Sequence, residues 1–145
     1  MTAIDFHVNA PDKVGYTCRL LRKAVGKGSK VVVTGEPAIL NELDLALWTF
    51  SPVDFIAHCH GQAGGAVMLA ASPVVLAETA QGAPHHEVLV NLGSKVPDGF
   101  ERYERLIEIV TRDAQDLQVG RSRWKHYADR GYALVKHDQA TTEVG

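Results

Sequence analysis

Residue types that bind metals gather in the middle of the chain, as His58, Cys59, His60 and the pair His85 and His86. If the first three lie in a strand, His58 and His60 project to the same side, because side chains alternate along a strand. Two histidines could then supply half of a tetrahedral zinc site. No C-x-x-C or H-E-x-x-H pair completes such a site. We therefore interpret these histidines as loop residues and predict no metal site.

Two segments carry glycines where a phosphate loop could form. Residues 34–37, Thr-Gly-Glu-Pro, follow a predicted strand and open a predicted helix, which is a usual position for a phosphate cradle. They lack the Lys-Ser/Thr pair of a P-loop and the G-x-G-x-x-G pattern, and Glu36 would repel a phosphate. Residues 61–65, Gly-Gln-Ala-Gly-Gly, precede a predicted strand and are typical of a flexible loop. The sequence therefore predicts no nucleotide site and no cofactor.

Catalytic nucleophiles and acid–base pairs are not indicated either. The chain has no G-x-S-x-G elbow, and Ser51, Ser72 and Ser94 have no patterned base near them. Glu42 and Asp44 could form a carboxylate pair, but residues two apart on a helix point in different directions. We therefore predict that the protein is not an enzyme. A nucleotide- or metal-dependent enzyme on an α/β frame is the alternative.

Large apolar side chains are concentrated near the end of the second predicted helix and just beyond it. They are Leu47, Trp48, Phe50, Pro52, Val53, Phe55 and Ile56. Packing in the core could account for several of them. Large aromatic residues on either side of a proline turn, in an irregular segment, are also typical of the anchor of a protein–protein interface.

The last predicted helix carries cations beside a large aromatic residue. The spacing of Arg121, Trp124, Lys125 and Ala128 places them on one helix face. Such a face suits a ligand with a carboxylate next to an aromatic group. It could equally stack a base of single-stranded nucleic acid and hold its phosphates. The structural alternative is that Trp124 turns into the core and the rest of the face is solvated.

Composition limits the function classes. The chain has 145 residues, 46% of them hydrophobic, and a formal net charge of -2. This size fits one domain, and the charge argues against a protein that coats nucleic acid. The N-terminus lacks the layout of a signal peptide, no apolar run is long enough for a membrane span, and two cysteines do not make a disulfide scaffold. We expect a cytoplasmic protein that does not enter membranes.

Hydrophobic periodicity predicts alternating strands and helices. We expect strands at residues 3–8, 30–34, 66–71, 73–77, 87–92 and 132–136, and helices at 14–25, from 36 onward, 100–110 and 114–130. The strands at 66–71 and 73–77 could pair as a hairpin, and Asp98 is the expected N-cap of the helix at 100–110.

Strand–helix–strand crossovers imply a parallel core sheet. The predicted fold is therefore α/β, three layers (α/β/α) around a mostly parallel mixed sheet, Rossmann-like but without the nucleotide fingerprint. We expect one domain over residues 1–145, with a flexible tail from about residue 138.

Two segments resemble a known family. Residues 43–58, LDLALWTFSPVDFIAH, resemble the signature of the DNA polymerase III chi subunit family, approximately L-D-x-x-L-W, a short turn and F-[IV]-P-H. The last helix, R-x-R-W-K-x-Y, followed by Gly131 and Tyr132, is similar to the C-terminal segment of that family. The order of the elements and the opening I-D-F strand also agree, so the resemblance covers nearly the whole chain.

This resemblance implies an accessory, non-catalytic role in DNA replication. Members of the family bind the psi subunit, which connects them to the clamp loader of the bacterial polymerase. The family phenylalanine in that interface matches Phe55, and we place Pro52 and Ile56 in the same interface.

The resemblance also implies that the acidic C-terminal tail of single-stranded DNA-binding protein is a partner. That tail ends in a phenylalanine carboxylate, so its site requires a basic rim and an apolar pocket. The matching residues are Arg121, Trp124 and Lys125 on the last helix, and Trp48 after the L-D-x-x-L motif. DNA would then be contacted mostly indirectly. Direct binding of single-stranded DNA by Trp124 and its neighbouring cations is the alternative.

Three positions depart from the family pattern. Ala57 stands where a proline commonly precedes the histidine, and His7 replaces a tyrosine often found after I-D-F. Leu117, one turn before Arg121, occupies a position where a lysine contributes to the tail site in some members. One cation fewer is expected to weaken the capture of an acidic peptide.

Overall fold

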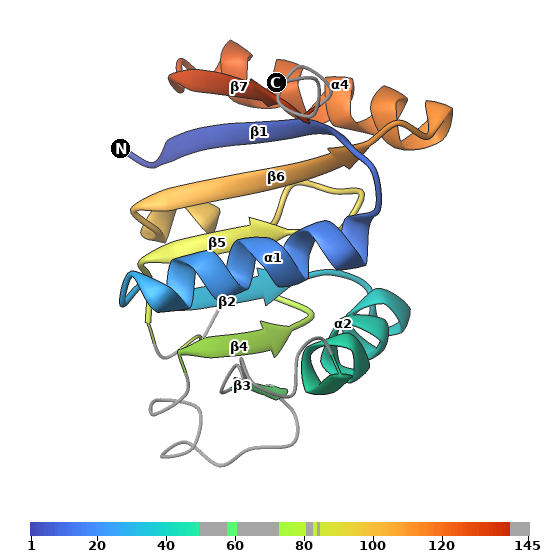
Figure 1. The fold of residues 1–145 in the computed structure, drawn as a ribbon. Helices are drawn as coiled ribbons and strands as arrows, with labels where there is room; N and C mark the ends of the chain where they lie inside the picture. The colour runs from blue at the N-terminus through green and yellow to red at the C-terminus, as the bar shows by residue number, and fades with distance from the viewer. Residues whose placement is uncertain (50–57, 61–72, 81–82, 84, 140–145) are drawn as a thin grey trace.

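A computed structural model describes residues 1–49, 58–60, 73–80, 83 and 85–139. Within these residues, seven strands form one sheet in the order β3-β4-β2-β5-β6-β1-β7 (Figure 1). The strands are β1 (Ala3–Ala10), β2 (Val31–Thr34), β3 (His58–His60), β4 (Val74–Ala77), β5 (Val88–Asn91), β6 (Arg105–Thr111) and β7 (Leu134–Asp138). The helices are α1 (Lys13–Gly26), α2 (Pro37–Thr49), the short 3-10 helix η1 (Phe100–Arg102) and α4 (Ala114–Asp129). All pairs between these strands are parallel.

Local sequence explains where α1 and α4 begin. Asp12 caps α1, because its carboxylate accepts a hydrogen bond from the backbone N–H of Gly15 at 2.8 Å. Asp113 caps α4 in the same way, accepting from the backbone N–H of Asp116 at 3.0 Å. Both helices therefore begin at an aspartate that satisfies an otherwise unpaired backbone donor.

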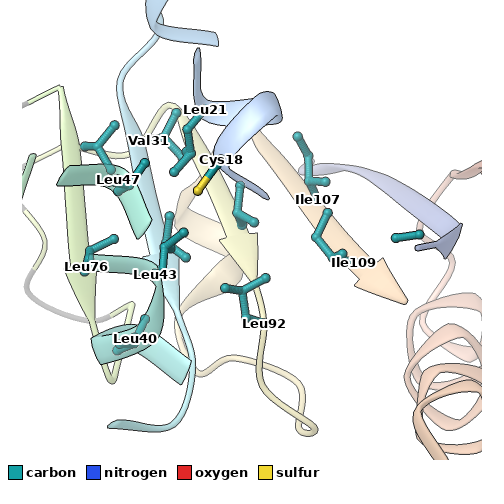
Figure 2. Packing of buried hydrophobic residues seen from close by; sticks show 14 residues of the cluster. Cys18, Leu21, Val31, Leu40, Leu43, Leu47, Leu76, Leu92, Ile107 and Ile109 are labelled. Carbon is teal, nitrogen blue, oxygen red and sulfur yellow. The ribbon is translucent and has the colours of Figure 1, made fainter. Parts of the chain in front are cut away.

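Helices cover both faces of the sheet, which confirms the three-layer prediction. Alternation along β2 sends Val31 and Val33 to one face and Val32 to the other, and all three are fully buried. The first face packs against α1 and α2. Figure 2 shows this cluster, with Cys18 from α1 and Leu43 from α2 among the residues that fill it.

Aromatic side chains gather on the second face, which α4 covers. Tyr127 of α4 is fully buried, and its ring contacts Phe100 of η1 and Phe6 of β1 with centroid separations of 5.2 and 6.0 Å. These edge-on contacts are a favourable geometry for aromatic pairs. They fix α4 against the strands that position the candidate site.

The predicted helix at residues 100–110 is wrong. Only Phe100–Arg102 forms a short 3-10 helix, after Gly99 with φ +83, so Asp98 does not act as the N-cap. Residues 105–111 form β6, a central strand between β5 and β1. Their apolar spacing also fits a helix, but residues 106–110 are all buried, which is typical of a strand covered on both faces.

The interpretation of His58 and His60 as loop residues is also wrong, because His58–His60 form β3, which pairs in parallel with β4. The remaining expected elements in the described residues differ from the structure mainly at their ends. β7 ends two residues later than predicted, at Asp138. The predicted strand at 66–71 lies outside the described residues, and β4 pairs in parallel with β2 and β3. No helix in the described part of the chain is long and apolar enough to cross a membrane.

Candidate functional site

A pocket of about 450 Å³ lies between α4 and the sheet, and we call it the α4 pocket. It is lined from β1 by Phe6, Val8 and Asn9, from β6 by Val110, from α4 by Leu117, Gly120, Arg121 and Trp124, and from β7 by Lys136. Most of these side chains are apolar, and the polar groups are few. Pockets of this kind hold an apolar group and orient it through a small number of polar contacts.

Trp124 forms one wall of the α4 pocket. Its indole lies at 66° to the ring of Phe6, with a centroid separation of 5.0 Å, and the residue is half-buried. Two readings of Trp124 were open from the sequence, a core residue or a ligand-facing residue. The structure combines them, because one side of the indole packs on Phe6 while the residue also lines the pocket.

Gly120 allows α4 to approach the sheet closely at this point. A Cβ atom at Gly120 would lie 3.0 Å from Cγ2 and 3.1 Å from Cγ1 of Val110, closer than side chains normally pack. The helix therefore needs its smallest residue over β6. This close approach sets the depth of the α4 pocket beside Arg121.

A β-bulge in β1 shapes the floor of the α4 pocket. The register of β1 against β6 shifts between His7 and Ala10, and Asn9 has a left-handed backbone with φ 59. As a result Val8 packs under α4 whereas Ala10 joins the cluster under α1 and α2. The Asn9 amide donates a hydrogen bond to the Asp138 carboxylate at 2.8 Å, which connects the bulge to the end of β7.

Charge in the α4 pocket is positive. Arg121 and Lys136 line it, and no carboxylate is among the described residues that do so. Lys125, predicted to share the site, does not line the pocket; its side chain is 77% exposed and contacts the Asp129 carboxylate at 3.3 Å. Lys136 was not among the predicted site residues, although alternation along the last strand places it on the same face as Leu134.

A buried polar network holds α4 in place behind the pocket. Arg123 Nε donates to Glu108 Oε1 at 3.0 Å, the Tyr127 hydroxyl donates to Oε2 at 2.6 Å, and the Asn91 amide donates to Oε1 at 2.9 Å. Burial raises the pKa of Glu108, whereas the charge of Arg123 and these hydrogen bonds act in the opposite direction. Arg123 therefore has a structural position, unlike its neighbour Arg121.

A second pocket, of about 320 Å³, lies at the carboxyl end of β2 and β5 and includes the predicted glycine turn at Gly35. Glu36, Glu78 and Asp98 line it together with Lys95. Three carboxylates beside one lysine disfavour a phosphate, in agreement with the sequence argument against a nucleotide site. Among the described residues, no group of three or more His, Cys, Asp or Glu side chains could hold a metal ion.

Trp48 lies apart from the other predicted tail-site residues. It is on α2, where it is 55% exposed, three residues after Leu45, which is 67% exposed. α2 packs on the sheet face opposite α4 and contacts β4, whereas α4 contacts β6 and β7 (Figure 1). The structure thus brings Arg121 and Trp124 together but not Trp48. The predicted psi-interface residues, Pro52, Phe55 and Ile56, lie outside the described residues.

Comparison with known proteins identifies the family. The model of the family described as "DNA polymerase III chi subunit, HolC" matches residues 1–135. The chain belongs to the DNA polymerase III chi subunit family. It is also 29% identical over 142 residues to DNA polymerase III subunit chi of Pseudomonas aeruginosa, a match that covers 94% of this chain and 96% of that protein. The resemblance found in the sequence is therefore confirmed, and it assigns the chain to the accessory subunits of the bacterial replicative polymerase.

The two segments that resemble the chi family fall on different surfaces. The L-D-x-x-L-W motif forms the C-terminal part of α2 and ends at the exposed Trp48. The R-x-R-W-K-x-Y motif lies on α4, where it contributes Arg121 and Trp124 to the pocket and Arg123 and Tyr127 to the buried network. Two residues of the second motif thus line the pocket, two belong to the buried network, and Lys125 does neither.

Proposed function

We propose that this chi-family chain is a non-catalytic, cytoplasmic adaptor of the clamp-loader assembly. In this proposal it forms one domain that binds the acidic C-terminal tail of single-stranded DNA-binding protein and the psi subunit. The observation that carries the proposal is the α4 pocket, where Arg121 lies beside the half-buried Trp124 and carboxylates are absent from the described lining. An acidic peptide with a terminal phenylalanine has the complementary chemistry.

Each part of such a tail has a counterpart at the α4 pocket. The terminal phenyl ring fits the apolar walls formed by Phe6 and Trp124, since edge-on aromatic contacts add to the free energy of burial. The terminal carboxylate suits the guanidinium of Arg121, which can donate two parallel hydrogen bonds. Acidic residues upstream are attracted by the exposed Lys125 outside the pocket, a contribution that salt would screen.

A second surface supports the proposed psi contact. Leu45 and Trp48 are exposed large apolar residues one turn apart on α2, just before the segment that contains Pro52, Phe55 and Ile56. Exposed apolar patches of this kind often mark protein–protein interfaces. We therefore assign Trp48 to the psi-binding surface, because α2 and α4 cover opposite faces of the sheet.

Calorimetric titration with a synthetic acidic peptide ending in Pro-Phe tests the tail site. We expect saturable binding that falls as salt rises, and a loss of about tenfold or more in affinity for Arg121→Ala, since a charge-assisted pair to a carboxylate is removed. Lys27→Ala is the matched control, because Lys27 is exposed at the end of α1, away from the α4 pocket. Amidation of the peptide carboxylate should reproduce the loss. Equal binding of the amidated and free peptides would contradict the proposed pocket.

The same variants test the direct nucleic-acid alternative. A single-stranded oligonucleotide in place of the peptide should show no saturable binding at moderate salt, because the chain carries a net charge of -2. Tight binding to the oligonucleotide that Arg121→Ala abolishes would favour direct binding instead.

A further inference from the structure

We propose that Lys136, on β7, is the second cation of the tail site and holds an anionic group of the peptide from the sheet side of the α4 pocket. The inference rests on the proposed function, in which the pocket takes an acidic peptide with a free terminal carboxylate. Lys136 belongs to none of the motifs that revealed the family, and it lies on a different element from Arg121. Three observations support it.

The register of β7 directs Lys136 toward α4. Lys136 is paired with Phe6, and Leu134 with Ile4, in the parallel ladder between β7 and β1. Ile4 and Phe6 belong to the buried cluster under α4, and Leu134 packs against the same cluster. Because side chains alternate along a strand, Lys136 shares this face, and it lines the α4 pocket beside Phe6.

Lys136 and Arg121 approach the α4 pocket from two walls, the sheet and the helix. Neither forms an ion pair with another residue in the part of the chain that the structure describes. The nearby acids have other partners: Asp138 accepts from Asn9, and Asp129 lies beside Lys125. Two cations on one apolar pocket without an internal counter-ion leave the positive charge available to an external anion.

Lys136 adds a second cation to a pocket whose helix side carries only Arg121 among the described residues that line it. Leu117 lines the α4 pocket one turn before Arg121, where its side chain adds apolar surface and no charge. Lys136 supplies a positive charge to the same pocket from β7. The two cations that line the pocket therefore come from different elements, and Leu117 contributes apolar surface between α4 and the sheet.

Titration of the full chain with the acidic peptide ending in Pro-Phe tests the inference. We expect Lys136→Ala to lower the affinity about fivefold and to reduce its dependence on salt, as loss of one partly exposed charge contact implies. Lys136→Arg should retain binding, and Lys27→Ala should leave it unchanged.

In the Lys136→Ala background, Leu117→Lys should restore most of the lost affinity, because both positions line one pocket. Because Lys136 is exposed on β7, its substitution should leave the midpoint of thermal unfolding nearly unchanged. A change in affinity would then not result from loss of folding.

The outcomes separate the inference from the proposed function. If the unaltered chain binds, Arg121→Ala abolishes binding and Lys136→Ala binds as tightly as the unaltered chain, the role of Lys136 is overturned while the tail site stands. If the unaltered chain does not bind the peptide at low salt, both are overturned. A fivefold loss for Lys136→Ala that Leu117→Lys restores would support both.

Discussion

The guanidinium of Arg123 and the carboxylate of Glu108 form an ion pair at 3.0 Å inside the protein, with their side chains 2% and 0% exposed. The pair joins α4 to β6, and Arg123 Nη1 also donates to the Ser94 carbonyl at 3.1 Å. A buried charge is stabilised by an opposite charge and by hydrogen bonds, and Arg123 has these through Nε and Nη1, whereas its buried Nη2 has no hydrogen-bond partner among the described residues. This pair therefore fixes the position of the helix that carries the α4 pocket.

Removal of one member of this pair should strongly destabilise the folded protein. We expect Arg123→Met to lower the free energy of unfolding by about 3–5 kcal/mol, because Glu108 is left as an uncompensated buried group. Urea denaturation measures the change. Lys125→Ala is the control on the same helix; its contact with Asp129 is exposed and should contribute no more than about 0.5 kcal/mol. A cost below about 1 kcal/mol for Arg123→Met would contradict the expectation that Glu108 is left as an uncompensated buried charge in the variant.

Tyr127→Phe tests the hydroxyl contribution to the same network. The Tyr127 hydroxyl donates to Glu108 Oε2 at 2.6 Å, and a hydrogen bond to a charged acceptor is typically worth about 1.5–3 kcal/mol. We expect a loss of that size in the free energy of unfolding. Tyr132→Phe is the matched control, because Tyr132 packs on the same aromatic cluster without a hydroxyl hydrogen bond in the described part of the chain. Equal effects of the two substitutions would contradict this role.

Gly120→Ala should reduce both stability and peptide binding. The added methyl would lie 3.0 Å from Val110, so α4 must move away from β6, and overpacking of this kind typically costs about 1–3 kcal/mol. Gly26→Ala is the control, since no atom lies within 4 Å of a Cβ there and alanine favours a helix. Thermal unfolding and peptide titration measure the two effects. If Gly120→Ala changed stability and peptide affinity as little as Gly26→Ala does, the close approach of α4 to β6 would not be required for the α4 pocket.

His7 should make stability depend on pH. Burial, followed by the charge of His137, lowers the pKa of His7 from 6.5 to about 4, with Asp5 acting in the opposite direction. The unfolded chain therefore binds a proton at higher pH than the folded chain. The contribution of His7 to stability is then present above pH 6.5 and is lost as the pH falls from 6.5 to about 4.

Urea denaturation between pH 4 and pH 7 measures this effect. His7→Leu should flatten the pH dependence of the unfolding free energy in that interval. Tyr16→Phe is the control, because it removes the hydroxyl that hydrogen-bonds to His7 Nδ1 and keeps the imidazole. The same slope in His7→Leu and the unaltered chain would refute the assignment to His7.

Local patterns were sufficient for most of the fold. Three consecutive valines indicated β2 as a buried strand, and the apolar spacing of α1 and α4 indicated helices. The caps were not predicted: Asp12 and Asp113 cap these helices, whereas the one predicted cap, Asp98, caps none. β6 could not be recognised in this way. Glu108 interrupts its apolar run and suggests a solvent-facing helix side, and only Arg123, from the next element, makes that charge acceptable in the interior.

The candidate site was predictable where it depends on one helix. Arg121 and Trp124, three residues apart, both line the α4 pocket, as their spacing indicates. Lys125 was grouped with them because it is four residues after Arg121, but it lies about 100° around the helix from Trp124, and it contacts Asp129 instead of lining the pocket. The place of Lys136 depends on the register between β7 and β1, the two ends of the chain, which no local pattern contains.

The strand order has a consequence for synthesis of the protein. β1 leaves the ribosome before the other described strands, yet its neighbours in the sheet are β6 and β7, which follow all the others in sequence (Figure 1). Ile4 and Phe6 therefore lack their strand partners in the described sheet until β6, about 100 residues later, has been translated. The nascent N-terminal segment must remain unpaired through most of translation, so truncated chains that end before β6 should bind chaperones and aggregate.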